Sequence, residues 1–245
     1  MLEGAARAGF AAVGLDDLTV RGRRPDEVGA LLLAHGLACT DVGVLRVGQG
    51  EIRAQADGLV ALAAATGART CIAALYTQTP GEAIADLRTG VAILAEAGVR
   101  TALEFAAYGG LRTMAEAIEI CAGIGWERCG LLVDTWHFFR GGEPWDLLRS
   151  LEPEQIALVH LNDAPAPIGD DVVHESRFRR TVPGGGTFRL DEFARALDAI
   201  GYDGVVSVEV LSADLSRRPP AEGAQELHDS LQAFRLGPAV RVEMN

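Results

Sequence analysis

Gly130-Leu131-Leu132-Val133-Asp134 is a short apolar run that ends in a carboxylate, and this sequence pattern indicates how the chain folds. An ionisable side chain at the end of a buried strand is costly unless a partner compensates its charge. Three further apolar runs end in the same way, in Glu104, His160 and Glu209. Because three carboxylates and one imidazole are hard oxygen and nitrogen ligands, we expect the four residues to share one divalent cation.

Short apolar runs alternate with amphipathic helical patterns along the chain, which predicts a parallel sheet with right-handed crossovers. Seven such strands indicate a single α/β domain over residues 1–245, a (β/α)₈ TIM barrel with one strand missing from the count. The predicted strands are 10–15, 37–45, 70–76, 99–104, 130–134, 156–160 and 205–210. The predicted helices are 24–36, 52–66, 80–98, 111–124, 145–151, 190–200 and 221–234.

The missing strand should be the first, because the chain opens on a helix-like stretch, Leu2–Ala8, with no strand before it. We therefore expect that the natural start lies upstream or that the chain is truncated. The alternatives are an open barrel, or one closed by the tail Val240-Arg241-Val242. An unpaired strand edge would be an aggregation hazard.

Composition excludes several classes of partner. The formal net charge of −12 opposes nucleic-acid binding, which needs clustered Lys and Arg. No apolar run reaches the roughly 18 residues of a membrane span, and the N-terminus carries no signal-peptide pattern, so we expect a cytoplasmic protein. The cysteines form no C-x-x-C pair and lie in or beside apolar segments, which predicts buried free thiols: Cys39, Cys71, Cys121 and Cys129.

Two local motifs support the prediction of a divalent-cation site. Val133-Asp134-Thr135-Trp136-His137 places a carboxylate and an imidazole three residues apart, and Val159-His160-Leu161-Asn162-Asp163 repeats the arrangement. Asp163 is in reach to orient an imidazole. The irregular segment 162–189, which carries Arg180 ahead of Pro183-Gly184-Gly185-Gly186, should lie on the C-terminal face of the barrel, where active sites are found.

Together with Ser207-Val208-Glu209, these motifs resemble the xylose-isomerase-like TIM-barrel superfamily of sugar (phosphate) isomerases and epimerases. The resemblance runs from Leu2 to about Phe234 and is strongest from Glu104 to Glu209. It implies that His137 and Arg180 contact the substrate. It also implies one divalent metal ion, Mn²⁺, Mg²⁺ or Co²⁺ with Zn²⁺ as an alternative, bound by Glu104, Asp134, His160 and Glu209.

The same resemblance implies a reaction. The carboxylates matching Glu104 and Glu209 also move protons in the epimerase and isomerase branches, through a metal-stabilised enediolate. The expected activity is therefore isomerisation or epimerisation of a sugar, sugar phosphate or inosose, a small polyhydroxylated partner. Phe138-Phe139 would either line the pocket or make a homo-oligomeric contact.

Three rival functions stay open. The first is a lyase of the same superfamily, similar to 3-dehydroshikimate dehydratase or inosose dehydratase, and nothing in the sequence separates it from the isomerase. The second is an apurinic-site endonuclease, which the negative charge and the lack of histidines at the early strand ends oppose. The third is a barrel that has lost catalysis, which the full set of ligands opposes.

Overall fold

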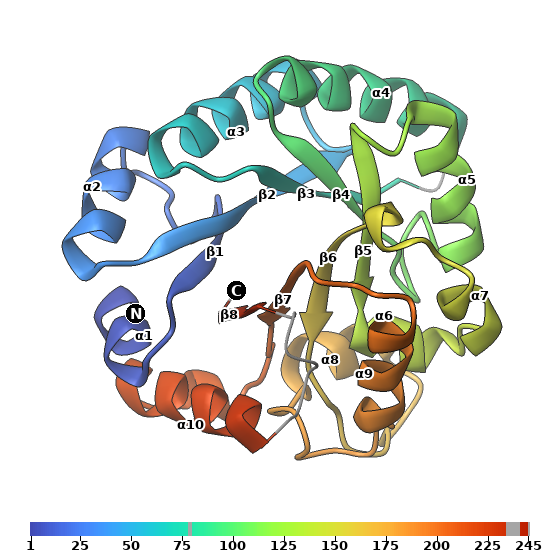
Figure 1. Cartoon of the computed structure of the whole chain (residues 1–245). Helices are drawn as coiled ribbons and strands as arrows, with labels where there is room; N and C mark the ends of the chain where they lie inside the picture. Colours follow the sequence, from blue (N-terminus) through green and yellow to red (C-terminus); the bar gives the residue numbers. More distant parts are fainter. Residues whose placement is uncertain (78–79, 234–240, 245) are drawn as a thin grey trace.

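In the computed structural model, eight parallel strands form a closed barrel surrounded by helices (Figure 1). The structure describes the whole chain except residues 78–79, 234–240 and 245. The predicted (β/α)₈ TIM barrel is thus confirmed. Its strands are β1 Ala12–Asp16, β2 Ala38–Val47, β3 Thr70–Leu75, β4 Arg100–Glu104, β5 Cys129–Asp134, β6 Ile156–Leu161, β7 Val205–Val208 and β8 Arg241–Met244.

The helices follow the predicted pattern closely, with two additions. Helices α6 and α8 were not predicted, and the first of these follows β5 without a break. The helices are α1 Leu2–Ala8, α2 Pro25–His35, α3 Ile52–Thr66, α4 Pro80–Glu96, α5 Met114–Ile124, α6 Thr135–Gly141, α7 Trp145–Arg149, α8 Val172–Phe178, α9 Leu190–Ala199 and α10 Pro220–Ala233. Across the described residues, none of the helices combines the length and apolarity that a membrane crossing requires.

The barrel is closed by the tail of the chain. Strand β8 pairs in parallel with β7 on one side and with β1 on the other, through the register partners Val205↔Arg241 and Val13↔Met244. The position between β7 and β1 is therefore filled by the tail, as in the tail-closed alternative. Helix α1 lies against α10, where Gly4 approaches the backbone of Ala221 so closely that a Cβ would lie 3.1 Å from it.

Caps set the helix boundaries. Helix α5 starts at a capping box in which Thr113 Oγ1 accepts from Glu116 N and Glu116 Oε2 accepts from Thr113 N. Helix α2 ends at Gly36, whose φ of 68° lies in the left-handed region that glycine adopts without strain. Asp134 caps α6 because its Oδ1 accepts from His137 N at 3.0 Å.

A small apolar cluster inside the barrel positions the candidate site. It consists of Ile72, Ala102, Leu132 and Leu158, which come from β3 to β6. Side chains two residues apart on a strand point to the same face. The residues that follow this cluster by two positions on β4, β5 and β6 therefore also point into the barrel, at its C-terminal mouth. These residues are Glu104, Asp134 and His160.

Candidate metal and substrate site

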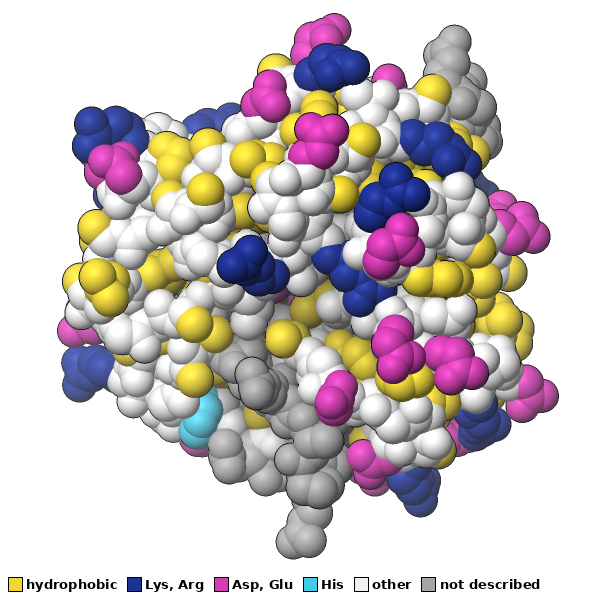
Figure 2. Space-filling model, turned by 45° about the horizontal axis from the view of Figure 1, so that its top comes forward, with side chains coloured by type: hydrophobic (Ala, Val, Ile, Leu, Met, Phe, Trp, Pro, Cys, Tyr) yellow, Lys and Arg dark blue, Asp and Glu magenta, His cyan; other side chains and the backbone are white. Residues whose placement is uncertain are grey.

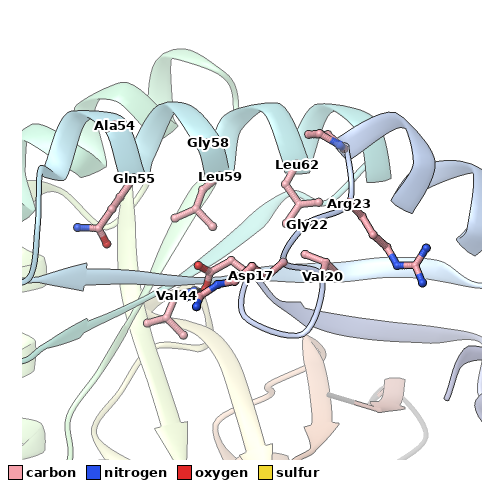
Figure 3. A pocket seen from close by; sticks show the side chains of 12 residues that line it. Asp17, Val20, Gly22, Arg23, Val44, Ala54, Gln55, Gly58, Leu59 and Leu62 are labelled. Atoms are coloured by element: carbon pink, nitrogen blue, oxygen red, sulfur yellow. Dashed lines mark hydrogen bonds between the residues drawn. The ribbon is translucent and has the colours of Figure 1, made fainter.

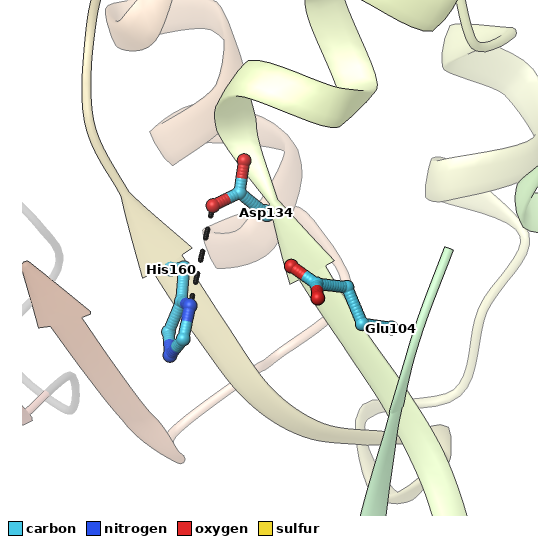
Figure 4. Close-up of side chains that lie close together, drawn as sticks. All are labelled: Glu104, Asp134 and His160. Atoms are coloured by element: carbon cyan, nitrogen blue, oxygen red, sulfur yellow. Dashed lines mark ion pairs between the residues drawn. The ribbon is translucent and has the colours of Figure 1, made fainter. Parts of the chain in front are cut away.

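Three of the predicted metal ligands converge at the barrel mouth. Ligand atoms of Glu104, Asp134 and His160 all lie within 4.8 Å of one another (Figure 4). Asp134 and His160 are fully buried, and Nδ1 of His160 lies 4.0 Å from Oδ2 of Asp134. Two carboxylates and one imidazole at this spacing fit a divalent cation.

Glu209, the fourth predicted ligand, lies beside this cluster. It follows β7 by one residue, and its Oε2 is 3.7 Å from His160 Nδ1. Arg180 lies between two of the carboxylates, because its Nη1 donates to Glu209 Oε2 at 2.8 Å and to Asp134 Oδ2 at 2.9 Å. The sequence placed Arg180 at the substrate, and in the structure its guanidinium is engaged by predicted ligands.

The loop after β6 supplies a partner that sequence analysis missed. Asn162 Nδ2 donates to Asp134 Oδ2 at 3.0 Å, and Thr135 Oγ1 donates to the carbonyl oxygen of Asn162 at 2.8 Å. Both residues are fully buried. These bonds fix the orientation of the Asp134 carboxylate. The signal was present in the sequence, because Asn162 lies two residues after His160 in the second motif.

His137 faces the cluster as a neutral imidazole. Its Nδ1 accepts from Ala107 N at 3.2 Å, so the proton belongs on Nε2, which lies 3.7 Å from Glu104 Oε1. Burial lowers the pKa of His137 to about 4. The rings of Tyr108 and Trp136 pack against it with centroids 5.5 Å and 5.1 Å away.

The charged groups of the site change one another's pKa values. Burial, followed by the charges of Glu209 and Asp134, raises the pKa of Glu104 to about 8. Burial alone would also raise the pKa of Glu209, but His160 and Arg180 hold it below its usual range. Burial lowers the pKa of His160, yet Glu209 and Asp134 outweigh it and bring that pKa to about 9. Without a cation, the site therefore holds extra protons at neutral pH.

The expectation for Asp163 needs correction. Its described side-chain hydrogen bonds go to backbone amides and to no imidazole. Oδ1 accepts from Ala164 N and Phe188 N, and Oδ2 accepts from Gly184 N and Gly186 N. Through these hydrogen bonds, Asp163 holds the long loop that carries Arg180 in its conformation. The physical reason is that the chain turns back after β6, which brings the Pro-Gly-Gly-Gly turn onto this carboxylate.

A further buried carboxylate, Asp41, lies within β2. It is fully buried, its Oδ2 accepts from Thr40 Oγ1 at 2.7 Å, and its Oδ1 has no hydrogen-bond partner among the described residues. Burial raises its pKa, and His160 lies near enough to oppose that shift. Asp41 was not among the predicted site residues, because an acidic residue in the middle of a strand gives no signal of its direction.

Comparison with known proteins identifies the family. The sequence model described as "Xylose isomerase-like TIM barrel" matches residues 2–234. The chain belongs to the xylose isomerase-like TIM barrel family. The family resemblance seen in the sequence motifs is therefore confirmed.

Curated relatives match about half of this xylose isomerase-like chain. An inosose isomerase of Bacillus velezensis is 29% identical over 124 residues, which are 50% of this chain and 43% of the relative. A 3-dehydroshikimate dehydratase of Pseudomonas aeruginosa is 34% identical over 96 residues, which are 39% of this chain and 15% of the relative. The chain thus spans less than half the length of the curated relatives it matches.

Solved structures of xylose isomerase-like barrels share the fold. The IolI protein, crystallised with a bound zinc atom, matches with a TM-score of 0.84 at 20% identity, over 95% of this chain and 90% of that one. An L-ribulose 3-epimerase matches with a TM-score of 0.72 at 19% identity, over 95% of this chain and 86% of that one. At these identities the likeness establishes the fold alone.

Proposed function

We propose that this chain is a divalent-metal-dependent isomerase or epimerase of a sugar, sugar phosphate or inosose. The observation that carries the proposal is the arrangement of four strand ends. Glu104 and Glu209 lie at the two ends of an arc formed by β4, β5, β6 and β7, with Asp134 and His160 between them. A substrate held over this arc would meet a carboxylate from either side.

The metal would be held by Glu104, Asp134 and His160, with Glu209 as the fourth ligand. Mn²⁺, Mg²⁺ and Co²⁺ suit this donor set, and Zn²⁺, which the IolI structure contains, is the alternative. When bound, the ion would polarise the substrate carbonyl and acidify the neighbouring C–H. This assignment is supported by the close spacing of the three donors and by the burial of Asp134 and His160.

The chain's own residues would then move the proton. One of the carboxylates Glu104 and Glu209 removes a proton from the carbon beside the carbonyl, and the other returns a proton. Return to the opposite face of that carbon inverts it. Return to the former carbonyl carbon, with transfer of the neighbouring hydroxyl proton to the former carbonyl oxygen, moves the carbonyl. His137 Nε2–H and Arg180 supply donors at the edge of the same space, where a substrate oxygen would lie.

A lyase is the second candidate, and one observation favours it. The 3-dehydroshikimate dehydratase of P. aeruginosa matches 39% of this chain. The first half of the reaction would be the same, because a carboxylate removes the proton beside the carbonyl. A hydroxide would then leave from the adjacent carbon, assisted by a protonated group, and the proton would not be returned. An inosose dehydratase would follow the same course.

The experiment that tests the proposal combines elemental analysis with proton exchange. Purified protein supplemented with Mn²⁺ is incubated in D₂O with ketoses, inososes and 3-dehydroshikimate, and the substrates are followed by NMR. One metal per chain and deuterium beside a carbonyl would support the isomerase or epimerase. Loss of water would transfer the assignment to the lyase. A protein that binds no metal and exchanges no proton would contradict both.

The proposal also covers the extent of the domain and the location of the protein in the cell. We propose one barrel domain over residues 1–245 and a cytoplasmic location. All four cysteines are free and buried, which fits a reducing compartment.

A further inference from the structure

A second arginine faces the site from the other side of the barrel mouth. Arg46 on β2 is the register partner of Ala74 on β3, and Ala74 is the register partner of Glu104 on β4. Register partners of parallel strands share a face of the sheet. Leu45 confirms the direction, because it points outward to α4, where a Cβ on Gly90 would lie 2.6 Å from its Cδ2. Arg46 therefore points into the barrel, in the same row as Glu104.

The guanidinium of Arg46 is held by two acidic residues. Its Nη1 donates to Asp17 Oδ1 at 2.7 Å and to the carbonyl oxygen of Val44 at 3.2 Å, and its Nη2 lies 3.4 Å from Asp16 Oδ1. Asp17 Oδ1 also accepts from Val44 N at 3.1 Å. Figure 3 shows Asp17 beside Val44, at the edge of a pocket of about 280 Å³ under α3 that none of the candidate metal ligands lines. The Arg46 head group is thus fixed in direction.

A single strand, β3, separates Arg46 from Glu104. The residue between them is Ala74, which contributes only a methyl group, and neighbouring strands are about 4.8 Å apart. The backbones of Arg46 and Glu104 are therefore about 10 Å apart across β3. Tyr76, which is 44% exposed, follows β3 at the rim and lies within electrostatic reach of both residues.

The charges of the mouth distinguish between classes of ligand. Among the described residues, two buried or half-buried guanidiniums face the mouth, and each is paired with two carboxylates. Those of Arg46 are Asp16 and Asp17, and those of Arg180 are Asp134 and Glu209. Together with Glu104 there are five carboxylates for these two arginines. A bound divalent cation would therefore leave the group without net positive charge. A phosphate or carboxylate group entering this space would meet uncompensated acidic oxygens.

We infer that Arg46, held by Asp16 and Asp17, binds the end of the substrate remote from the reacting carbons, and that this substrate is an uncharged polyol. A guanidinium that donates next to carboxylates that accept is complementary to hydroxyl groups, which do both. A free ketose or an inosose meets this requirement, and a sugar phosphate or an acid such as 3-dehydroshikimate does not. The inference rests on the proposed function, and it adds a specificity-determining residue to that function.

One nearby cation could reverse this preference. Arg177 on α8 is exposed, acts electrostatically on Tyr76, and makes no ion pair with the described part of the chain. A phosphate bound at the rim would use Arg177. The experiment therefore includes a variant of each arginine.

The test separates binding from chemistry. Full-length protein loaded with Mn²⁺ is titrated by calorimetry with a free ketose, its phosphate ester, an inosose and 3-dehydroshikimate, and the same mixtures are followed for exchange in D₂O. Arg46→Gln should weaken binding of the uncharged ligands by roughly tenfold to a hundredfold, as expected for lost hydrogen bonds to a charged group. Arg46→Lys should recover part of this loss. The affinity for Mn²⁺ should stay unchanged, because Arg46 contacts no candidate ligand in the described contacts.

Two controls complete the design. Arg53→Gln, at an exposed position on α3, should leave every binding constant unchanged. Arg177→Gln should leave binding of the uncharged ligands unchanged. Unfolding curves of all variants establish that the fold is retained.

The outcomes are distinguishable. Unchanged binding in Arg46→Gln would overturn the inference, and so would a phosphate ester that binds more tightly than its parent sugar and loses this advantage in Arg177→Gln. In both cases proton exchange would leave the proposed function standing. If uncharged ligands bind in an Arg46-dependent way but exchange no proton, the inference about recognition would be supported and the proposed isomerase activity would be contradicted.

Discussion

Arg180 donates from Nη1 to Asp134 Oδ2 over 2.9 Å, which joins the long loop after β6 to the end of β5. Both side chains are almost completely buried, with exposed fractions of 2% and 0%. The same Nη1 reaches Glu209, so one guanidinium compensates two carboxylates. Charges this deeply buried are stable only when they are paired.

Removal of Arg180 should therefore destabilise the metal-free protein. Arg180→Gln removes the guanidinium that pairs with Asp134 and Glu209, and loss of one partner of a buried pair costs about 3–5 kcal/mol. Urea unfolding in EDTA measures the change. Added Mn²⁺ should reduce the difference from wild type, because the ion would compensate the same carboxylates. An equal difference with and without Mn²⁺ would argue against a shared charge site.

The two proton-transfer carboxylates have their own prediction. Glu104→Gln and Glu209→Gln should each lower the exchange rate in D₂O by about 10²-fold or more, since an amide cannot take up the proton. Binding of Mn²⁺ should weaken as well, and electron paramagnetic resonance can measure it. Glu119→Gln, an exposed position on α5, is the matched control. Normal turnover in either site variant would refute the assignment.

Stability of the metal-free protein should fall as the pH rises from about 6.5 to 9, because below about 6.5 the lowered pKa of His137 opposes the effect of Glu104. The pKa of Glu104 is raised to about 8, so its folded form holds a proton that the unfolded chain releases near 4.5. The pKa of His160 is raised to about 9, so its contribution is full below about 6.5 and is lost as the pH passes 9. Melting temperatures in EDTA across this range measure the trend.

Metal should reverse that trend. Its ligands bind without their protons, so the rise in melting temperature caused by Mn²⁺ should be larger at pH 8.5 than at pH 6. In Glu104→Gln the decline without metal should be shallower. A metal-free melting temperature that climbs from pH 6.5 to 9 would contradict the pKa directions on which this prediction depends.

Gly186 should tolerate no side chain. A Cβ there would overlap Asp163 Oδ1 and lie 2.5 Å from the carbonyl oxygen of Ala164. Gly186→Ala should cost about 1–3 kcal/mol, as overpacking does, and should also reduce exchange activity because the turn positions the loop of Arg180. Gly58→Ala on α3 is the matched control, since nothing lies within 4 Å and alanine favours a helix by about 1 kcal/mol. Equal stability changes in the two variants would contradict the packing argument.

The cysteines should be inert in the folded protein. Burial raises the pKa of the Cys39 thiol to about 12 and also raises the pKa of Cys71. The contact with Cys129, followed by burial, raises the pKa of Cys121. Because the thiolate is the reactive form, Ellman's reagent at pH 8 should label no thiol in native protein and all four in urea. Rapid labelling of a native thiol would show that a strand or helix opens locally.

Much of the site could be predicted because strand ends carry a clear signal. Glu104, Asp134 and His160 follow apolar residues by two positions on consecutive strands, so their shared direction follows from the period of a strand. Helices α6 and α8 gave no such signal. Each has seven residues, about two turns, and each begins at an aspartate cap, Asp134 or Asp171.

Other features of the structure could not be predicted, because they depend on contacts between residues that are distant in the sequence. Asp163 lies next to the second motif, but its direction is set by the return of the chain at Gly184 and Gly186. The pairing of Arg180 with two carboxylates is equally nonlocal. Strand β8 has four residues, so its role emerges only from the free edges of β1 and β7.

This closure also constrains how quickly the ring can form. Val13 and Met244 come from opposite ends of the sequence, so their pairing is among the most nonlocal contacts that the chain makes. Contacts of this kind are reached late and slowly during folding, since a long loop must be ordered first. Until then β1 and β7 expose unpaired amide and carbonyl groups, which can recruit a neighbouring chain. Refolding yield should therefore decline as the protein concentration rises.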